Sequence, residues 1–136
     1  MDTLSKAKRS WNMSQIRSQD TFPEKIVRSA IRRLGYRIQL HVKDLPGRPD
    51  IVLPRRNTVV FVHGCFWHRH SRCRFTYTPK TRRTFWLRKF TENRDRDARA
   101  RRHLRKLGWK VITVWECQTN DVKTLTVRLK RLLSSG

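Results

Sequence analysis

The sequence predicts an α/β fold in which a mixed central β-sheet is flanked by helices. Three observations predict it. Some stretches repeat apolar residues at helical spacing, others are short and rich in β-branched and aromatic residues, and the two kinds alternate in the order helix, three strands, helix, strand, helix. The chain has 136 residues, which is enough for one modest core and too few for two. We therefore expect one domain.

The first helix is expected to begin after Thr21. Thr21 and Glu24 have the spacing of a capping box, and Pro23 lies in the first turn, where its missing N–H costs little. Gly35 follows the last apolar position and is expected to end the helix. The apolar residues that recur on one helical face are Ile26, Val27, Ala30, Ile31 and Leu34.

Three strands are predicted after this helix. Residues 36–42 alternate apolar and polar side chains, which indicates a strand with one face in water. Residues 51–53 form a short apolar strand, and the four-residue connection 54–57 predicts a hairpin into the stretch 58–62. That stretch is β-branched or aromatic throughout, as is typical of a strand buried on both faces. The residues after Gly64 would then lie at one end of the sheet.

The second half of the chain predicts a long helix, a strand and a closing helix. Residues 84–107 carry many charges, with apolar positions at helical spacing, and Gly108 is the expected stop. Residues 109–115 are mostly apolar, and we expect them to form the central strand of the sheet. Residues 122–133 repeat leucine and valine on one helical face.

The chain carries a large excess of positive charge. It has 33 Lys and Arg against 10 Asp and Glu, a formal net charge of +23. A polyanion is therefore the expected partner, and nucleic acid is the leading candidate. The sequence shows no apolar run of about 18 residues, no signal-peptide pattern and no basic helix with a lipid-facing stripe. We expect a cytoplasmic protein.

The predicted elements all lie between residues 21 and 136. We interpret residues 21–136 as a single domain and the polar, basic residues 1–20 as an N-terminal arm that becomes ordered on DNA.

Three cysteines and a histidine have the composition of a zinc site. Cys65, His70 and Cys73 follow one another closely, and Cys117 would complete the set if its strand lies beside the strand 58–62. Thiolates and an imidazole in a tetrahedron suit a structural Zn²⁺. The alternative is three unrelated thiols in a basic loop.

Asp50 is the leading candidate for a catalytic acid. It opens a strand whose hairpin partner ends at His63, so its carboxylate could share a cleft with His63 and His68. A carboxylate there can bind Mg²⁺, and the metal can stabilise charge on a phosphate. The alternative is a turn aspartate that caps its own backbone.

Aromatic and basic residues supply candidate DNA contacts. Phe66 and Trp67 are adjacent in the chain, and the arginine-rich stretch 94–105 is suited to phosphates. For the aromatic residues, burial in the core is the alternative. The residues that lie at helical spacing along one side of the long helix are Trp86, Lys89, Phe90, Asn93 and Asp97.

Together these features resemble the very-short-patch repair (Vsr) mismatch endonucleases. The resemblance covers nearly the whole chain, and the Gly-Cys-Phe-Trp-His segment is its most specific part. It implies a restriction-endonuclease-like core with a structural zinc site, and the nicking of duplex DNA on the 5′ side of a thymine mispaired with guanine, the lesion left by deamination of 5-methylcytosine. The matching segments are residues 9–13, Glu24, 45–50, 61–68, 85–86 and 109–117.

The resemblance also implies catalytic roles. Asp50 would bind the catalytic Mg²⁺, together with the backbone carbonyl of Val62. His68 would be the general base for the attacking water, and His63 would support the phosphate. Glu24 would hold metal-bound water rather than only cap a helix. Val62 stands where the family pattern has threonine, but a carbonyl ligand does not depend on the side chain.

The resemblance implies two further sets of residues. The structural zinc ligands would be Cys65, Cys73, Cys117 and a histidine. The spacing before Cys73 is longer than in the family pattern, so His68 and His70 are both open as that histidine; we favour His70 because His68 is then left for chemistry. Around the mispair, three aromatic residues would enter the base stack as a wedge, a methionine would enter from the opposite groove, and two polar residues would read the bases. In that order they are Phe66, Trp67 and Trp86; Met13; and Lys89 and Asn93.

The sequence leaves two alternatives to a mismatch-nicking enzyme. One is a zinc-stabilised, non-catalytic DNA-binding module, and the other is a restriction or homing endonuclease of the same fold that cuts undamaged sites. For the mismatch enzyme we expect a monomer acting on double-stranded DNA with a T·G mismatch, with repair-pathway proteins as candidate further partners.

Overall fold

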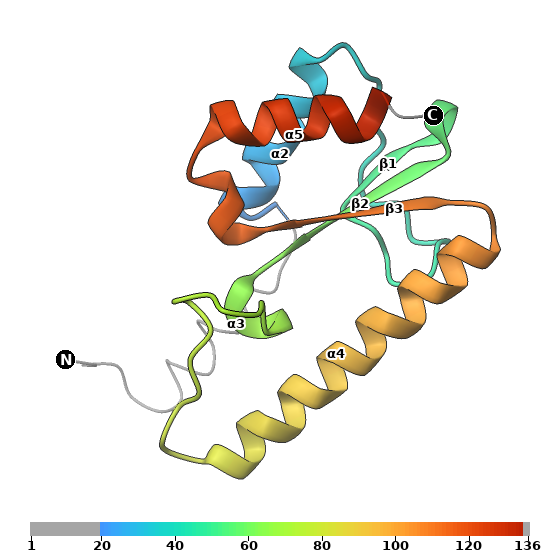
Figure 1. Ribbon diagram of the computed structural model, residues 1–136. Coiled ribbons are helices and arrows are strands. Elements are labelled where there is room, and N and C mark those ends of the chain that lie inside the picture. Colours follow the sequence, from blue (N-terminus) through green and yellow to red (C-terminus); the bar gives the residue numbers. More distant parts are fainter. Residues whose placement is uncertain (1–19, 135–136) are drawn as a thin grey trace.

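The computed structural model describes residues 20–134, which form a three-stranded mixed sheet with helices on both sides (Figure 1). The strands are β1 (Ile51–Leu53), β2 (Thr58–His63) and β3 (Lys110–Trp115), in the spatial order β1-β2-β3. β1 pairs with β2 antiparallel, and β2 pairs with β3 parallel. The predicted mixed sheet and the predicted hairpin are confirmed.

Three long helices surround the sheet: α2 (Phe22–Arg33), α4 (Arg83–Lys106) and α5 (Val122–Ser134). Their predicted positions were right to within one or two residues. α2 and α5 lie side by side over one face, and α4 crosses the other (Figure 1). The arrangement is therefore three layers, helix, sheet and helix.

Each face of the sheet has its own apolar core. Alternate residues of β1 and β2 point to opposite faces, so Ile51 and Val60 pack with α2 and α5, whereas Val52 and Val59 pack with Leu104 of α4. This explains why β2 is apolar at nearly every position.

Two strand predictions were wrong. Residues 36–42 form no regular strand and touch the sheet only through a single bridge between Gln39 and Val52. Their alternating pattern has another cause, because this extended segment packs its apolar side chains beside the strands without a ladder of hydrogen bonds. β3 is an edge strand, since no other described strand pairs with its second edge, and β2 is the central one.

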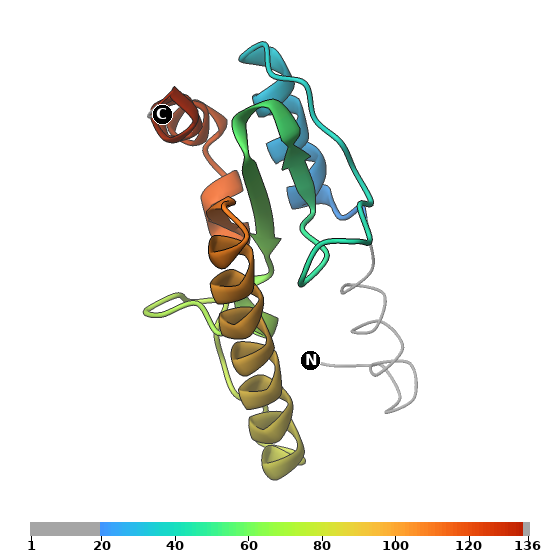
Figure 2. The same ribbon diagram turned by 90° about the vertical axis from the view of Figure 1, so that its right-hand side faces the viewer.

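The sequence did not predict the short helix α3 (Cys65–His68), which follows β2 directly. It lies between the end of the sheet and α4 (Figure 1), and its last residue is followed by Arg69 in a left-handed conformation. Within residues 20–134, two short 3₁₀ helices accompany these elements, η1 (Pro54–Arg56) in the hairpin and η2 (Glu116–Thr119) after β3. Figure 2 shows α4 continuing well past the ends of the strands.

The predicted arm, residues 1–20, lies outside the described residues except for Asp20, and so does Met13. Within the described part of the chain, no helix is long and apolar enough to cross a membrane.

Candidate active site and metal centre

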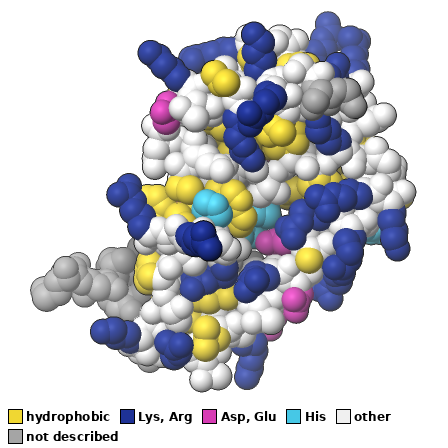
Figure 3. Space-filling view, in the orientation of Figure 1, with side chains coloured by type: hydrophobic (Ala, Val, Ile, Leu, Met, Phe, Trp, Pro, Cys, Tyr) yellow, Lys and Arg dark blue, Asp and Glu magenta, His cyan; other side chains and the backbone are white. Residues whose placement is uncertain are grey.

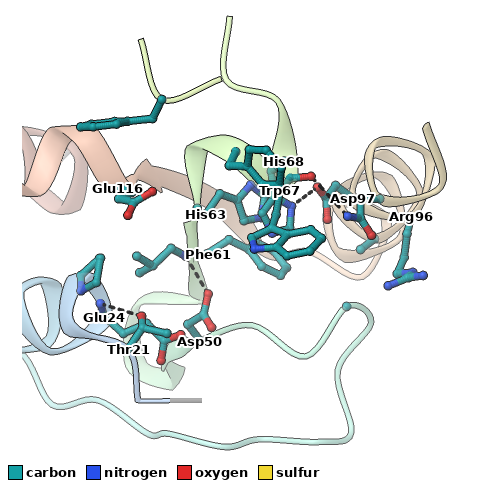
Figure 4. Close-up of a pocket in the computed structure, with 18 of the residues that line it drawn as sticks. Thr21, Glu24, Asp50, Phe61, His63, Trp67, His68, Arg96, Asp97 and Glu116 are labelled. Atoms are coloured by element: carbon teal, nitrogen blue, oxygen red, sulfur yellow. Dashed lines mark hydrogen bonds and ion pairs between the residues drawn. The ribbon is translucent and has the colours of Figure 1, made fainter. Parts of the chain in front are cut away.

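A cavity of about 540 Å³ opens at the C-terminal end of β2 and is lined by all four predicted catalytic residues (Figure 4). Glu24 and Asp50 lie on one side of it, and His63 and His68 lie on the other (Figure 4). These residues come from α2, the start of β1, β2 and α3, so the cavity forms only when the sheet and both helical layers are assembled.

Gly47 brings the turn that carries Asp50 close to α4. Its φ is +75°, a conformation that side chains disfavour, and a Cβ there would lie 2.6 Å from the Cβ of Ala100. Only glycine therefore allows this approach, which places Asp50 at the rim of the cavity formed by β2 and α4.

Asp50 and Glu24 form an acidic wall. The carboxylate of Asp50 accepts a hydrogen bond from the backbone N–H of Val62 at 2.6 Å. The pKa of Asp50 is raised to about 7, chiefly by burial and also by the charge of Glu24, while the Val62 N–H and the charge of Arg28 act in the opposite direction. A carboxyl group whose charged form is disfavoured beside a second carboxylate fits a hard divalent cation, which favours oxygen ligands.

Glu24 is oriented by its own helix. Its Oε2 accepts from the backbone N–H of Asp20 at 2.9 Å and from Arg28 at 3.2 Å, and its backbone N–H donates to the hydroxyl of Thr21 at 3.4 Å. Half of the predicted capping box is thus formed, with the return bond going to Asp20 instead of Thr21. Arg28 is buried and also pairs with Asp20 at 2.7 Å. No pattern in the sequence distinguished Arg28 from the many exposed arginines.

The opposite wall is a stacked pair of histidines held by an aspartate. The rings of His63 and His68 are 3.9 Å apart and nearly parallel, and Nδ1 of His68 lies 2.5 Å from Oδ2 of Asp97. His63 is buried, and its Nδ1 has no hydrogen-bond partner among the described residues. Burial lowers the pKa of His63 to about 3, and the charges of His68 and Arg101 act in the same direction, against Asp97. His63 is therefore neutral at physiological pH.

Asp97 is the functional residue to which sequence reasoning assigned no role. It was noted only for its place on one side of α4, and its partner His68 is 29 positions earlier in the chain. Burial acts to raise the pKa of Asp97, but the hydrogen bond and charge of His68 outweigh it and hold the pKa below its usual value. Asp97 is thus a carboxylate that orients and supports His68.

The predicted zinc residues come together. One ligand atom from each of Cys65, His70, Cys73 and Cys117 lies within 4.8 Å of all the others. Nδ1 of His70 is 3.7 Å from Sγ of Cys65 and 3.4 Å from Sγ of Cys117. The parallel pairing of β2 with β3 explains this cluster, because it puts His63 opposite Trp115 and so brings the residues after both strands together.

This cluster fits a thiophilic metal. Burial raises the pKa of the Cys65 thiol to about 12, so a cation is needed to hold it as a thiolate. His70 is the histidine grouped with the cysteines, whereas His68 is engaged by Asp97. The indole of Trp115 stacks on His70 with ring centroids 4.3 Å apart, which fixes the plane of the imidazole.

The predicted wedge residues form one aromatic cluster between α3 and α4. The ring of Phe66 lies 5.3 Å from Trp67, 5.8 Å from Trp86 and 5.1 Å from Phe90. Trp67 is only 7% exposed, while Phe66 and Trp86 are half-buried. Asn93, a predicted base reader, is 3% exposed and donates from its side-chain amide to the carbonyl of Trp67 at 3.2 Å. In this structure Asn93 therefore joins α3 to α4.

Lysine and arginine side chains surround the site. Figure 3 shows histidine and acidic side chains in a hollow, with basic side chains spread over the elements around it. This distribution suits a site approached by a polyanion.

Comparison with known proteins gives consistent matches. The family model described as DNA mismatch endonuclease Vsr matches residues 1–74. The type II nicking enzyme V.XorIIP of Xanthomonas oryzae pv. oryzae is 49% identical over 132 residues, which cover 97% of this chain and 96% of that enzyme. The type II nicking enzyme V.NmeAIP of Neisseria meningitidis is 43% identical, with 97% and 94% covered. The DNA mismatch endonuclease Vsr of Escherichia coli K12 is 42% identical over 125 residues, with 92% and 80% covered.

Proposed function

The chain belongs to the Vsr family of DNA mismatch endonucleases, and we propose that it nicks one strand of duplex DNA on the 5′ side of the thymine in a T·G mispair. Such mispairs arise when 5-methylcytosine deaminates, and the nick would initiate very-short-patch repair. The observation that carries the proposal is a single cavity with an acidic wall, Asp50 and Glu24, facing a histidine wall, His63 and His68.

The acidic wall is proposed to bind the catalytic Mg²⁺. Asp50 is the charged ligand, and Glu24 accepts hydrogen bonds from water in the cavity. The backbone carbonyl of Val62 is the third group, because the N–H and C=O of one strand residue face the same neighbour and the N–H of Val62 already binds Asp50. When bound, Mg²⁺ supplies positive charge against the phosphate.

The histidine wall is proposed to accept the proton of the attacking water. With Nδ1 of His68 engaged by Asp97, Nε2 is left to accept a proton from the attacking water, and Asp97 stabilises the imidazolium that results. His63 stays neutral and supports the phosphate. His68 is thus the general base, and Asp97 determines which of its nitrogens reacts.

The cysteine cluster is proposed to hold a structural Zn²⁺. Four protein ligands, Cys65, His70, Cys73 and Cys117, leave no open position for a substrate. They connect the ends of β2 and β3 with the segment after α3, and so support the wall that carries His68. The core around this site is proposed to be restriction-endonuclease-like, since the acid lies at the hairpin and helices cover both sheet faces.

Recognition of the mispair is proposed to use the predicted contact residues. Phe66, Trp67 and Trp86 would enter the base stack, and unstacking costs less at a wobble pair than at a matched pair. In that complex Trp67 must leave its buried position. The remaining contacts, outside or beside this cluster, are Met13, Lys89 and Asn93. We propose a monomeric enzyme acting on DNA in the cytoplasm, with repair-pathway proteins downstream.

The test is a nicking assay with Mg²⁺ on three duplexes: one with a T·G mispair, one fully matched, and one already nicked as a size control. The proposal predicts one nick, in the thymine strand of the mismatched duplex only. Cleavage of both strands of matched DNA would instead identify a restriction or homing enzyme. Binding without cleavage of any duplex would identify a non-catalytic binding module.

Two substitutions locate the chemistry. Asp50→Asn should keep mismatch binding and lose nicking, whereas Asp44→Asn, at an exposed carboxylate, should change neither. His68→Ala should slow nicking about 10²–10⁴-fold, and His103→Ala is its matched control on the exposed side of α4. Near-normal turnover by Asp50→Asn or His68→Ala would refute the assigned roles.

A further inference from the structure

The segment between α3 and α4 carries an aromatic residue to which no role has been assigned. Tyr77 is 57% exposed, and its ring lies 4.9 Å from that of Phe66. The contacts continue from Phe66 to Trp86 at 5.8 Å and from Trp86 to Phe85 at 5.1 Å, and Phe85 is 42% exposed. These four rings form a row, Tyr77, Phe66, Trp86 and Phe85, whose two ends face solvent.

The backbone on both sides of Tyr77 is tied down. The hydroxyl of Thr76 lies 3.1 Å from the carbonyl of Cys65 and 2.9 Å from that of His70. The guanidinium of Arg69 donates to the carbonyl of Tyr77 at 2.8 Å and to the hydroxyl of Thr78 at 2.9 Å. Loop residues are usually mobile, but these bonds hold the backbone at Tyr77, and with it the position from which the ring contacts Phe66.

Arg69 makes these bonds at a cost in backbone energy. Its φ is +56°, in the left-handed region that disfavours a side chain. Its guanidinium lies 4.0 Å from the ring centroid of Phe90 and packs inside the aromatic cluster. Among the described residues it forms no ion pair with a carboxylate. The forked donors of Arg69 therefore bond mainly to the loop, with one longer bond of 3.5 Å to the carbonyl of Phe66, and the side chain acts as a clamp between the helices and Tyr77.

The row of rings leads out of the active-site cavity. Phe66 and Tyr77 line the same cavity as Asp50 and His68, and exposed Arg74 lies at the same wall. A strand whose phosphate sits between Asp50 and His68 would thus pass the row with its neighbouring nucleotides. The net charge of +23 makes DNA the occupant that matches this surface.

We propose that Tyr77 is a further DNA-contacting residue, stacking on a base or sugar next to the mispair, and that Arg69 is the residue that positions it. The proposal rests on the proposed mismatch-nicking function. A ring whose backbone is already held in place loses less conformational entropy on binding, so more of its stacking energy contributes to affinity. Stacking uses the ring face, so the phenolic hydroxyl is dispensable.

The first test is a set of binding isotherms at one fixed salt concentration for a T·G duplex and a matched C·G duplex. Tyr77→Ala should weaken T·G binding about 5- to 150-fold, the range of one lost base stack, and should weaken C·G binding by less. Tyr77→Phe, which keeps the ring and removes only the hydroxyl, should retain wild-type affinity for both duplexes. Val127→Ala removes an exposed apolar side chain from α5, away from the cluster, and should have no effect.

The second test asks whether Arg69 acts through Tyr77. Arg69→Lys keeps the charge and removes the fork, and Thr78→Val removes one of its acceptors with little disturbance of the fold. Both should weaken T·G binding in the same direction as Tyr77→Ala. Combining either with Tyr77→Ala should weaken binding no further than Tyr77→Ala alone. If the effects multiply instead, Arg69 does not position Tyr77. Thermal melting of each variant identifies any general loss of the fold.

The two proposals can fail separately. If the wild-type protein does not prefer T·G to C·G, the proposed function is wrong and the role of Tyr77 falls with it. If the wild-type protein prefers T·G and Tyr77→Ala retains both the affinity and the preference, only the role of Tyr77 is wrong.

Discussion

Asp50→Asn should make the protein more stable, provided that no divalent cation is present. In the folded protein the pKa of Asp50 is raised from 3.8 to about 7, chiefly by burial. Between these two pH values the folded state holds a proton that the unfolded chain has released, so stability falls as pH rises from about 4 to about 7. Asparagine stays neutral, still offers an oxygen to the N–H of Val62, and escapes this loss.

The expected gain in the free energy of unfolding follows from the pKa shift of Asp50. At about 1.4 kcal/mol per pH unit, a rise from 3.8 to about 7 corresponds to about 4 kcal/mol. Asp50 keeps partial contact with solvent, so we expect about 2–4 kcal/mol at pH 7.5. For a domain of this size that is a rise in Tm of about 10 °C.

The assay is thermal and urea unfolding from pH 4 to 8, without added divalent cation and without chelator, so that the cysteine cluster is left undisturbed. Wild type, Asp50→Asn and the control Asp44→Asn are compared. The difference in unfolding free energy between Asp50→Asn and wild type should vanish near pH 4 and grow towards pH 7.5. Added Mg²⁺ should stabilise wild type and leave Asp50→Asn unchanged. A variant equal to wild type at pH 7.5, or a difference that does not vary with pH, would show that Asp50 does not bear a buried, destabilising charge.

Three further predictions concern the metal, the proton and the mispair. Purified protein should contain about one equivalent of zinc by elemental analysis, and Cys117→Ser, which breaks the link between β2 and β3, should lower Tm and unfold more than a loop; less than about half an equivalent in wild type would count against a structural zinc. Asp97→Asn should slow single-turnover nicking by about 10²–10⁴-fold with unchanged DNA affinity, because it removes the charge that orients the base and supports the imidazolium; a change in affinity alone would contradict this role. Trp67→Ala should reduce the preference for T·G over C·G duplexes in binding isotherms, whereas Arg99→Ala should weaken the affinity for both duplexes almost equally. Equal losses of affinity for Trp67→Ala would mean that the ring only packs. Circular dichroism would confirm the fold of each variant.

Residue patterns within short stretches of the chain were sufficient to predict the long helices and the hairpin, because these elements depend on residues close in sequence. The helices follow from apolar spacing and from their caps, as at Thr21 and Gly35. The β1–β2 hairpin follows from its short connection. The chemical types needed at the site were also readable, since Cys65, Cys73 and three histidines lie at or just after the end of one predicted strand and Asp50 opens its hairpin partner.

The tertiary structure decided everything that depends on contacts between distant residues. The alternation in residues 36–42 is equally compatible with a strand and with an extended segment packed beside one, and only the neighbouring strand determines which forms. The burial of Trp67 likewise depends on α4, which is reached through the long segment after α3.

The site itself shows the same division. The sequence by itself drew attention to Asp50, His68, Cys65 and Cys73, because they lie within or beside one short stretch. Cys117 joined them only on the condition that its strand lies beside β2, and the role of His68 came from the family resemblance. Only the tertiary structure joined His68 to Asp97, across 29 positions. Such pairs leave no periodic trace in the sequence, because they are created when the parallel β2–β3 pairing and the packing of α3 on α4 close long loops. The energy of those contacts must offset the entropy of closure.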